Sequence, residues 1–365
     1  MKRYGHIYKK IYDKENIRSA ILRASKGKRY RNDVRRILNN MPHYIDIIHN
    51  ILITESFIPS DFKIDTVKEG ISQKERIICK PKFFPDQIVQ WAIMLQIAPI
   101  LKKGMYEHTC GSVPGRGVHY GKKHVERWIR NDRKNTKYFL KLDIAKFYPT
   151  VDIEILKTKL KRKIKDKKLL VIIFAILDKG APGLPIGMLI SQWFANFYLQ
   201  DLDHYIKQEL KAPHYVRYMD DMIIFGKNKR ELHIIKKAIS KYLKEENLKL
   251  KSNWQLYKLN KEALDFMGFR FFENKTILRK TIMLRITRKV KKVSKKERPT
   301  HHDACGVISY LGWIKHSDSF NLFNKWIKPY IQIKKLKQII RCHEKERCEN
   351  VKNNRSYRYA RNKTA

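Results

Sequence analysis

The sequence predicts an α+β fold, and three observations lead to this prediction. Residues 214–226 read HYVRYMDDMIIFG, an apolar β-hairpin interrupted by two aspartates, because strand-forming residues flank the pair on both sides. Residues 138–142 (YFLKL) form a second apolar strand. Elsewhere apolar residues recur at intervals of three and four, the spacing of a helix face, as at Tyr44, Ile47, Ile48, Ile51 and Leu52.

The composition describes a folded and strongly basic protein. The chain has 365 residues, 43% of them hydrophobic, including 19 Tyr and 6 Trp. This is enough for two or three packed subdomains without disulfide or metal staples. Lys and Arg total 80 against 35 Asp and Glu, a net charge of +45. Such a field implies a polyanionic partner and salt-sensitive binding, while the large core argues against a simple packaging protein.

Cysteine usage and hydropathy indicate the compartment. The five cysteines stand at irregular positions, as in proteins of a reducing compartment. The sequence contains neither a signal-peptide core nor an apolar run of about 18 residues. We therefore expect a cytoplasmic protein without a membrane partner.

The first part of the chain reads as a helical extension, a strand, a helix and a loop. Residues 1–60 mix basic stretches with helical spacing, which predicts a basic arm followed by a packed helix. A short strand led by Arg76 precedes a helix for which Asp86 is the expected N-cap. Residues 104–121 carry five glycines and a proline, typical of an irregular loop that can approach a nucleic-acid backbone closely.

The second part alternates helices with short strands. We expect one helix over residues 154–177, a Gly/Pro-rich loop leading into a helix from about Leu189, and a helix over residues 230–246. A pair of short strands follows at residues 265–272. After them come a basic run, a compact helical segment and a polar tail, at residues 279–298, 302–340 and 342–365.

The aspartate pair is the most informative feature of the hairpin. Leaving two ionised carboxylates in an apolar setting costs several kcal/mol per ion unless a cation neutralises them. Successive strand residues point to opposite faces, so we expect both Asp220 and Asp221 in the turn, with Asp220 the inner metal ligand and Asp221 the outer one. The alternative is an ordinary exposed turn, for which an Asp-Asp pair is also a common composition.

A third carboxylate favours the metal-binding interpretation. Asp143 directly follows the apolar strand of residues 138–142. Three carboxylates supply the hard oxygen donors that Mg²⁺ prefers. Two ions held about 3.5 to 4 Å apart can clamp the attacking and leaving oxygens of an in-line phosphoryl displacement. The spacing alone also permits coincidence.

Taken in order, these blocks resemble the motif series of reverse transcriptases over about residues 70–275, with weaker similarity to about 340. LKLDIAKFYPTVD resembles the first palm motif, GLPIGMLISQWFANFYL the loop and helix that hold the templating pair, RYMDDMIIF the YxDD hairpin, and DFMGFRFF the primer-grip hairpin. KERIICKP and CGSVPGRGVHYG are similar to fingers motifs of the group II intron branch. Several ordered blocks are far more specific than one.

The resemblance implies the domain organisation. It predicts a right-hand polymerase fold with fingers, a palm whose antiparallel sheet bears the YMDD hairpin, and a helical thumb. The expected parts are a basic helical extension, a fingers and palm core, a thumb and a basic tail, at residues 1–60, 61–275, 276–341 and 342–365. The implied activity is RNA-directed DNA polymerisation by two-metal phosphoryl transfer, with two Mg²⁺ ions, for which Mn²⁺ is a substitute.

One departure from the general pattern indicates a subtype. Most reverse transcriptases have Gln where this chain has Ile186, and the string IGMLISQ resembles the signature of diversity-generating retroelement reverse transcriptases. That family implies error-prone copying at template adenines, because a branched alkane replaces an amide near the incoming nucleotide. Alternatives are simple packing of Ile186 under the loop, another prokaryotic reverse transcriptase (retron, phage-defence or intron-derived), and a non-catalytic RNA-binding relic of a polymerase.

The resemblance also implies roles for individual residues. Asp143, Asp220 and Asp221 are the expected catalytic metal ligands, with the Ile144 carbonyl as a further ligand. Arg76, assisted by Lys74, is expected to grip the triphosphate, and Tyr148 to be the steric gate beneath the sugar. The remaining expected contacts are the nucleotide and template pocket at Ile186, Gly187 and Gln192, and the primer grip at Phe266, Gly268 and Phe269.

The resemblance does not assign the general-acid role to one residue. It also implies the partners of the protein. The position where relatives carry a candidate general-acid lysine reads Trp254 here, and Lys251 is the possible substitute. The implied ligands are dNTPs, a template RNA and the RNA/cDNA duplex. The subtype further implies a small basic, usually pentameric accessory variability determinant protein, in a bacterial or phage-infected cell.

Overall fold

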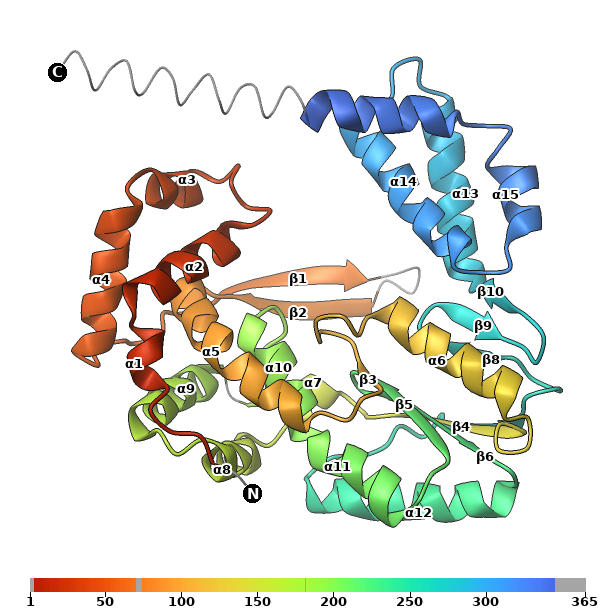
Figure 1. Ribbon diagram of the computed structural model, residues 1–365, viewed down its shortest axis with the longest axis horizontal. Helices are drawn as coiled ribbons and strands as arrows, with labels where there is room; N and C mark the ends of the chain where they lie inside the picture. Colours follow the sequence, from red (N-terminus) through yellow and green to blue (C-terminus); the bar gives the residue numbers. More distant parts are fainter. Residues whose placement is uncertain (1–2, 70–73, 181, 345–365) are drawn as a thin grey trace. The chain divides into compact units, whose positions relative to one another are not determined.

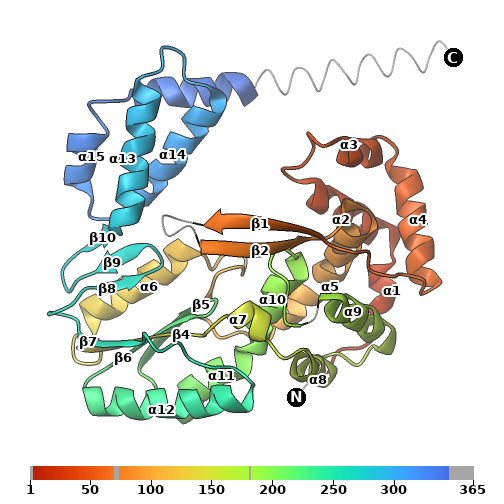
Figure 2. The same ribbon diagram turned by 180° about the vertical axis from the view of Figure 1, so that it is seen from behind.

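The computed structural model describes residues 3–69, 74–180 and 182–344, and the chain divides into two compact units (Figure 1, and from behind Figure 2). Unit 1 comprises the described residues of 1–121 and 132–257, and unit 2 those of 122–131 and 258 onward. Of Lys68, Glu69 and Lys74 the structure describes the backbone alone.

Four helices open unit 1, where the sequence predicted a basic arm and one packed helix. They are α1 (Tyr8–Ile11), α2 (Lys14–Ser25), α3 (Asn32–Asn39) and α4 (Met41–Ile53). Asp13 caps α2, because its carboxylate accepts hydrogen bonds from the amides of Glu15 and Asn16. Helix α2 packs against α4 and against α5 (Ile88–Gly104), as Figure 1 also shows. The expected helix around residues 44–52 is confirmed as α4, part of a larger helical layer.

An antiparallel hairpin follows, formed by β1 (Lys63–Glu69) and β2 (Lys74–Lys80). The expected N-cap at Asp86 is wrong. Asp86 lies in the short helix η1 (Phe83–Gln87), and its buried carboxylate accepts a hydrogen bond of 2.9 Å from the Ser60 amide. Helix α5 begins after Gln87, so Asp86 anchors the chain that enters β1 and does not cap the helix.

A five-stranded sheet forms the centre of unit 1. Its order is β3 (Thr109–Cys110), β5 (His214–Tyr218), β6 (Asp221–Gly226), β4 (Tyr138–Asp143) and β7 (Gln255–Lys258). Strands β5, β6 and β4 pair antiparallel, as predicted, whereas the short β3 pairs with β5 in parallel. Helix α12 (Lys229–Glu245) packs against β4 and β6, and Met222 to Phe225 are fully buried.

The helix expected over residues 154–177 is interrupted. The structure has α8 (Ile153–Lys163) and α9 (Lys167–Gly180), because the chain near Tyr4 inserts between them. The Tyr4 amide donates to the Lys163 carbonyl at 2.9 Å, and the Lys165 amide donates to the Tyr4 carbonyl at 2.7 Å. These bonds replace those that would have continued one helix.

The remaining helices of unit 1 include α10, which packs against α5 and α8. Helix α10 begins at Leu189, as predicted, and the others are short. Their bounds are α7 (Phe147–Thr150), α10 (Leu189–Tyr198), α11 (Gln200–His204) and η2 (Tyr205–Glu209).

Unit 2 combines a small sheet with helices. Residues 122–131 belong to α6 (Val118–Asn131), and the predicted strand pair at 265–272 is confirmed within a sheet of order β10, β9, β8. The basic run of residues 279–298 contains α13, which packs against α14. The bounds are β8 (Leu264–Phe266), β9 (Phe269–Phe271), β10 (Thr276–Leu278), α13 (Lys280–Ser294), α14 (His301–Lys315), α15 (Phe320–Trp326) and a helix at 333–344.

The C-terminal tail expected at residues 342–365 lies almost entirely outside the described residues, which end at 344. Within the part that the structure describes, no helix is long and apolar enough to span a bilayer.

Candidate active site

The register of the central sheet brings the predicted aspartates to one place. Strand β4 ends at Asp143, whose Cα partner on β6 is Asp221. The β5–β6 turn consists of Met219 and Asp220, since Tyr218 pairs with Asp221. The expectation that both aspartates lie in the turn is therefore wrong: Asp221 is the first residue of β6. An antiparallel register supplies the adjacency that side-chain alternation along a single strand cannot.

The carboxylates perturb one another. Burial raises the pKa of Asp221 to about 6, and the charge of Asp143 adds to this shift, while Lys141 opposes it. Burial and Asp143 also raise the pKa of Asp220. Desolvation and a neighbouring like charge both penalise an ionised carboxylate. The three groups therefore form a cluster that positive charge would stabilise.

A segment after α12 supplies one positive charge. Residues Ile144 and Leu250 form an antiparallel bridge, with the Lys251 amide donating to the Asp143 carbonyl at 2.8 Å. The Lys251 ammonium is also paired with the Asp143 carboxylate. Trp254 lies instead beneath the Lys236 ammonium, 4.0 Å from its ring centroid, in contact with α12. Lys251 is thus the residue of this segment that reaches the carboxylates.

The donor chemistry of the site fits a divalent cation. The Asp143 Oδ1 atom is buried and has no hydrogen-bond partner, and oxygen donors suit Mg²⁺ or Mn²⁺. The side chains are not closed around an ion: among the residues that the structure describes, no three His, Cys, Asp or Glu side chains are arranged to hold a metal. The bridge to Leu250 uses the Asp143 carbonyl and leaves the Ile144 carbonyl out of its hydrogen bonds.

Tyr148 and Arg76 lie within electrostatic reach of the carboxylates. Burial and the charge of Asp220 raise the pKa of Tyr148, and Arg76 acts in the opposite direction on both Tyr148 and Asp220. Phe147 is buried and packs edge-on against Tyr148 at 5.7 Å, as a core residue does. Lys74 begins β2, but its side chain lies outside the described residues.

The loop before α10 is clamped to β2. The Cys79 amide donates to the Ile186 carbonyl at 2.8 Å. Gly187 has φ +111°, and a Cβ there would lie 2.7 Å from both the Cys79 carbonyl oxygen and Ile78 Cγ2. Glycine is therefore required here by close approach of the chain to itself. The Ile186 side chain is half-buried, and Gln192 is exposed.

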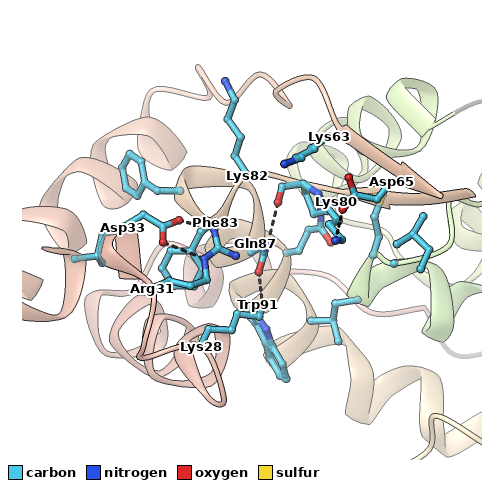
Figure 3. A pocket seen from close by; sticks show the side chains of 18 of the residues that line it. Lys28, Arg31, Asp33, Lys63, Asp65, Lys80, Lys82, Phe83, Gln87 and Trp91 are labelled. Atoms are coloured by element: carbon cyan, nitrogen blue, oxygen red, sulfur yellow. Dashed lines mark hydrogen bonds and ion pairs between the residues drawn. The ribbon is translucent and has the colours of Figure 1, made fainter. Parts of the chain in front are cut away.

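Gly187 and Gln192 border a large basic cavity, which we call the fingers cavity (Figure 3). Its volume is about 960 Å³. Figure 3 shows it bounded by side chains from the α2–α3 loop, the β1–β2 hairpin and the start of α5. Besides apolar residues it is lined by cations and aromatic rings, including Lys28, Arg31, Arg36, Lys63, Lys80, Lys82, Tyr30, Phe83, Phe84 and Trp91.

The predicted primer-grip residues form part of the core of unit 2. Phe266 and Phe269 are 1% and 0% exposed. Gly268 has φ +86°, and a Cβ there would lie 2.6 Å from Ile282 Cδ1. The conformation of this turn is thus explained by packing inside the unit, and the primer contact stays a prediction.

Sequence reasoning missed a buried ion pair beneath the hairpin. Arg217 and Asp203 are both 0% exposed and are joined by two hydrogen bonds of 2.6 and 2.7 Å. The available signal was a charged residue in the middle of an otherwise apolar strand, because a buried arginine requires a partner.

Comparison with known proteins identifies the fold. A family model described as reverse transcriptase (RNA-dependent DNA polymerase) matches residues 67–271, more than half of the chain, including all three aspartates. The chain belongs to the reverse transcriptase family. Membership confirms the predicted α+β right-hand polymerase fold. Reverse transcriptases generally use divalent metal ions, in agreement with the donor chemistry of the site.

Curated relatives of this reverse transcriptase are distant. Protein YkfC of Escherichia coli (strain K12) is 21% identical over 236 residues, covering 52% of this chain and 62% of that protein. The group II intron-encoded protein LtrA of Lactococcus lactis subsp. cremoris is 28% identical over 163 residues, covering 42% and 26%. The chain therefore spans less than two thirds of the length of either relative.

Solved structures matched by the chain include two telomerases. Apo telomerase from Candida tropicalis has a TM-score of 0.48 and 12% identity, covering 74% of this chain and 60% of that one. Telomerase from Candida albicans with a telomeric RNA fragment has a TM-score of 0.46 and 12% identity, covering 74% and 57%.

Replacing Asp221 with Asn should stabilise the metal-free protein. The pKa of Asp221 rises from 3.8 to about 6 on folding, so its ionisation costs stability that is absent below about pH 4 and complete above about pH 6. We expect Asp221→Asn to raise the free energy of unfolding in EDTA by up to about 3 kcal/mol at pH 8, with no gain at pH 3.5. Thermal melts at the two pH values measure this.

Asp132→Asn is the matched control. Hydrogen bonds from Asn135, together with His214, lower the pKa of Asp132, so its charge stabilises the folded state above its usual pKa. This variant should lose stability at pH 8. If Asp221→Asn also lost stability there, burial and the neighbouring carboxylates would not disfavour the charge of Asp221.

Proposed function

We propose that this reverse transcriptase polymerises DNA on an RNA template at Asp143, Asp220 and Asp221. The observation that carries the proposal is the β4–β6 register, which sets Asp143 opposite Asp221 beside the Asp220 turn. These carboxylates, with the Ile144 carbonyl, would hold two divalent ions, Mg²⁺ or in its place Mn²⁺. Bound ions would supply charge neutralisation and alignment for attack on the α-phosphate of a dNTP.

Side chains around the carboxylates fit the dNTP. Arg76, which is exposed on β2 and coupled to Asp220, has the guanidinium fork that suits a triphosphate. Lys74 on the same strand would assist it. Tyr148, also coupled to Asp220, would set its ring under the sugar and exclude a 2′-hydroxyl. Lys251 would be the candidate to protonate the leaving pyrophosphate, since its ammonium already reaches the Asp143 carboxylate.

Asp220→Asn should abolish primer extension. The change removes one negative charge and one ligand while keeping the shape of the turn, so we expect at least about a 1,000-fold fall in kcat, of the order seen when electrostatic stabilisation of a transition state is removed. Extension of a DNA primer on an RNA template with dNTPs and Mg²⁺ measures it.

The control for this experiment is Asp178→Asn. Asp178 is an exposed aspartate on α9 that pairs with Lys157, and its loss should leave extension unchanged. Full activity of Asp220→Asn would remove the assignment of the metal ligands, and inactivity of the parent chain with Mg²⁺ and Mn²⁺ would support the non-catalytic relic.

The fingers cavity has the chemistry to bind the single-stranded template ahead of the copied base. Its cations would contact phosphates and its rings would stack on bases. Lys28 is half-buried, and its ammonium donates to Gln87 Oε1 at 2.5 Å. Burial lowers the pKa of Lys28, and Arg31 adds to the effect. A phosphate placed here would therefore stabilise the charged form of an ammonium that burial disfavours.

Lys28→Ala and Lys82→Ala should each weaken binding of single-stranded RNA. Each variant loses one phosphate contact. In a plot of the logarithm of the binding constant against the logarithm of the salt concentration, the magnitude of the slope should therefore decrease by about 1. Fluorescence anisotropy with oligouridylate at several salt concentrations measures it. Lys237→Ala, at an exposed lysine of α12, is the control, and equal effects in all three variants would contradict template binding in the cavity.

We further propose that the subtype is that of diversity-generating retroelements. Support comes from the string IGMLISQ and from the position of Ile186, whose carbonyl is bonded to β2 while its side chain is half-buried. An aliphatic side chain there cannot form a hydrogen bond that would discriminate a correctly paired nucleotide from a mispaired one. A retroelement template RNA, the growing RNA/cDNA duplex gripped near Phe266–Phe269, and a small basic pentameric accessory protein would then be its partners.

Ile186→Gln should lower misincorporation opposite template adenine. The amide restores a group that can hydrogen-bond near the incoming nucleotide, and one good hydrogen bond gives discrimination of about 1 kcal/mol or about fivefold. Sequencing of cDNA copied from a defined RNA measures the error spectrum. Val171→Gln, at a 65% exposed position of α9, controls for the substitution itself. An unchanged spectrum would mean that Ile186 only packs under the loop.

A further inference from the structure

The turn that carries Asp220 has an unfavourable backbone conformation. Met219 has φ 57°, in the left-handed region that a non-glycine residue occupies at a cost of about 1 to 3 kcal/mol. It is the first central residue of a two-residue hairpin turn, a position that usually requires glycine or asparagine. A bulky residue stays in this conformation only if its surroundings hold it there.

Direct contacts fix Met219 on both sides. Arg217 Nη1 donates to the Met219 carbonyl at 2.8 Å, and the Met219 amide donates to the Cys110 carbonyl at 3.2 Å. Gly111, at φ +86°, makes room for the side chain, since a Cβ there would lie 3.1 Å from Met219 Cγ and Sδ. The backbone of the residue before Asp220 is therefore held by hydrogen bonds at its donor and at its acceptor.

Arg217 is itself completely engaged. Its Nε and Nη2 atoms donate to the two oxygens of Asp203 at 2.7 and 2.6 Å. Nη2 also donates to the Asn196 carbonyl at 3.4 Å, and Nη1 donates to Asn196 Oδ1 at 3.0 Å besides the Met219 carbonyl. All five N–H groups of a guanidinium thus have acceptors. A buried guanidinium whose five N–H groups all have acceptors is held in a single orientation.

Asn196 joins this guanidinium to the segment that follows β3. Its Nδ2 atom donates to the Gly111 carbonyl at 3.0 Å, and the same atom lies 3.7 Å from Met219 Sδ. Asn196 is buried in α10, the helix that begins directly after the Ile186–Gly187 loop. It therefore touches every component of the turn's support: the arginine, the Gly111 segment and the Met219 side chain.

We propose that Arg217 and Asn196 are positioning residues that hold the Met219–Asp220 turn, and with it the Asp220 carboxylate, in register with Asp143 and Asp221. The inference rests on the proposed polymerase activity for its kinetic consequence. Neither side chain is proposed to touch a substrate. Loss of either would allow the turn to relax from its left-handed conformation and would move Asp220 from its working position.

The hydrogen bonds around Arg217 include one, from Tyr215, whose removal can serve as the control for the loss of Asn196. The Tyr215 hydroxyl donates to Asp203 Oδ1 at 2.7 Å and is as deeply buried as Asn196. It supports the same ion pair but makes no hydrogen bond with the turn among those the structure records. Asn196→Ala removes one side-chain partner each from the Gly111 carbonyl and from Arg217 Nη1. Tyr215→Phe removes one donor from Asp203 Oδ1, which still accepts from Arg217 Nε. Each lost hydrogen bond costs about 1 kcal/mol, so both variants should lose stability and Asn196→Ala should lose the more.

The test compares Asn196→Ala with Tyr215→Phe in the full chain. We expect Asn196→Ala to lower kcat for primer extension by about 10- to 100-fold, because small misplacement of a catalytic group has effects of this size, with KM for dNTP unchanged. Tyr215→Phe should keep kcat within about twofold, although its melting temperature also falls. In metal-free protein, hydrogen exchange at the Met219 amide should accelerate in Asn196→Ala and stay protected in Tyr215→Phe.

Two results would overturn the proposal: unchanged exchange and kcat in Asn196→Ala, or equal losses of kcat in both variants, which would make the network a general stabiliser. If Asn196→Ala does not fold, Asn196→Asp carries the same test, because it keeps the acceptor for Arg217 and removes the donor to Gly111. The exchange measurement needs no activity, so failure of the polymerase assignment itself would show separately, as absence of extension in the parent chain.

Discussion

Burial and mutual repulsion of three carboxylates, at the end of β4 and the start of β6, are the constraint on which the centre of this protein depends. The register sets Asp143 against Asp221, and burial prevents water from screening them. Lys251 is paired with Asp143, and Arg76 acts on Asp220 from β2. Elements that are distant in the sequence thus meet at the carboxylates, where each contributes a charge or a supporting contact. Without cations, such a cluster costs the folded state stability.

Local patterns in the sequence were sufficient to predict several elements, and the three aspartates that they singled out lie together in the structure. The apolar strands of residues 138–142 and 214–226 and the start of α10 at Leu189 were predictable, because alternation, turn residues and helical spacing are local properties. The direct pairing of Asp143 with Asp221 could not be derived from them. Register is set by the pairing of two strands and the turn between them, and the side-chain alternation of one strand alone suggested a different placement.

Other residues have a purpose in the tertiary structure that their local sequence does not reveal. Asp86 has the sequence context of a helix cap but accepts a hydrogen bond from Ser60. Gly187 has the context of a ligand-binding loop, yet Ile78 and Cys79 occupy the space next to it. In both cases the decisive partner is remote in the sequence. For Arg217 the situation is reversed. An arginine in an apolar strand predicts a buried partner, but the sequence does not identify that partner as Asp203.

The insertion of the chain near Tyr4 between α8 and α9 has a consequence for biosynthesis. Asp166 Oδ2 accepts hydrogen bonds from the amides of Ile7 and Tyr8, contacts that span 159 and 158 residues. During translation, residues 4–8 leave the ribosome long before their partners exist. Contacts of such sequence separation form late, so the nascent N-terminal helices remain incompletely docked until residue 166 has emerged. Their exposed apolar faces during that interval are a natural target for chaperones.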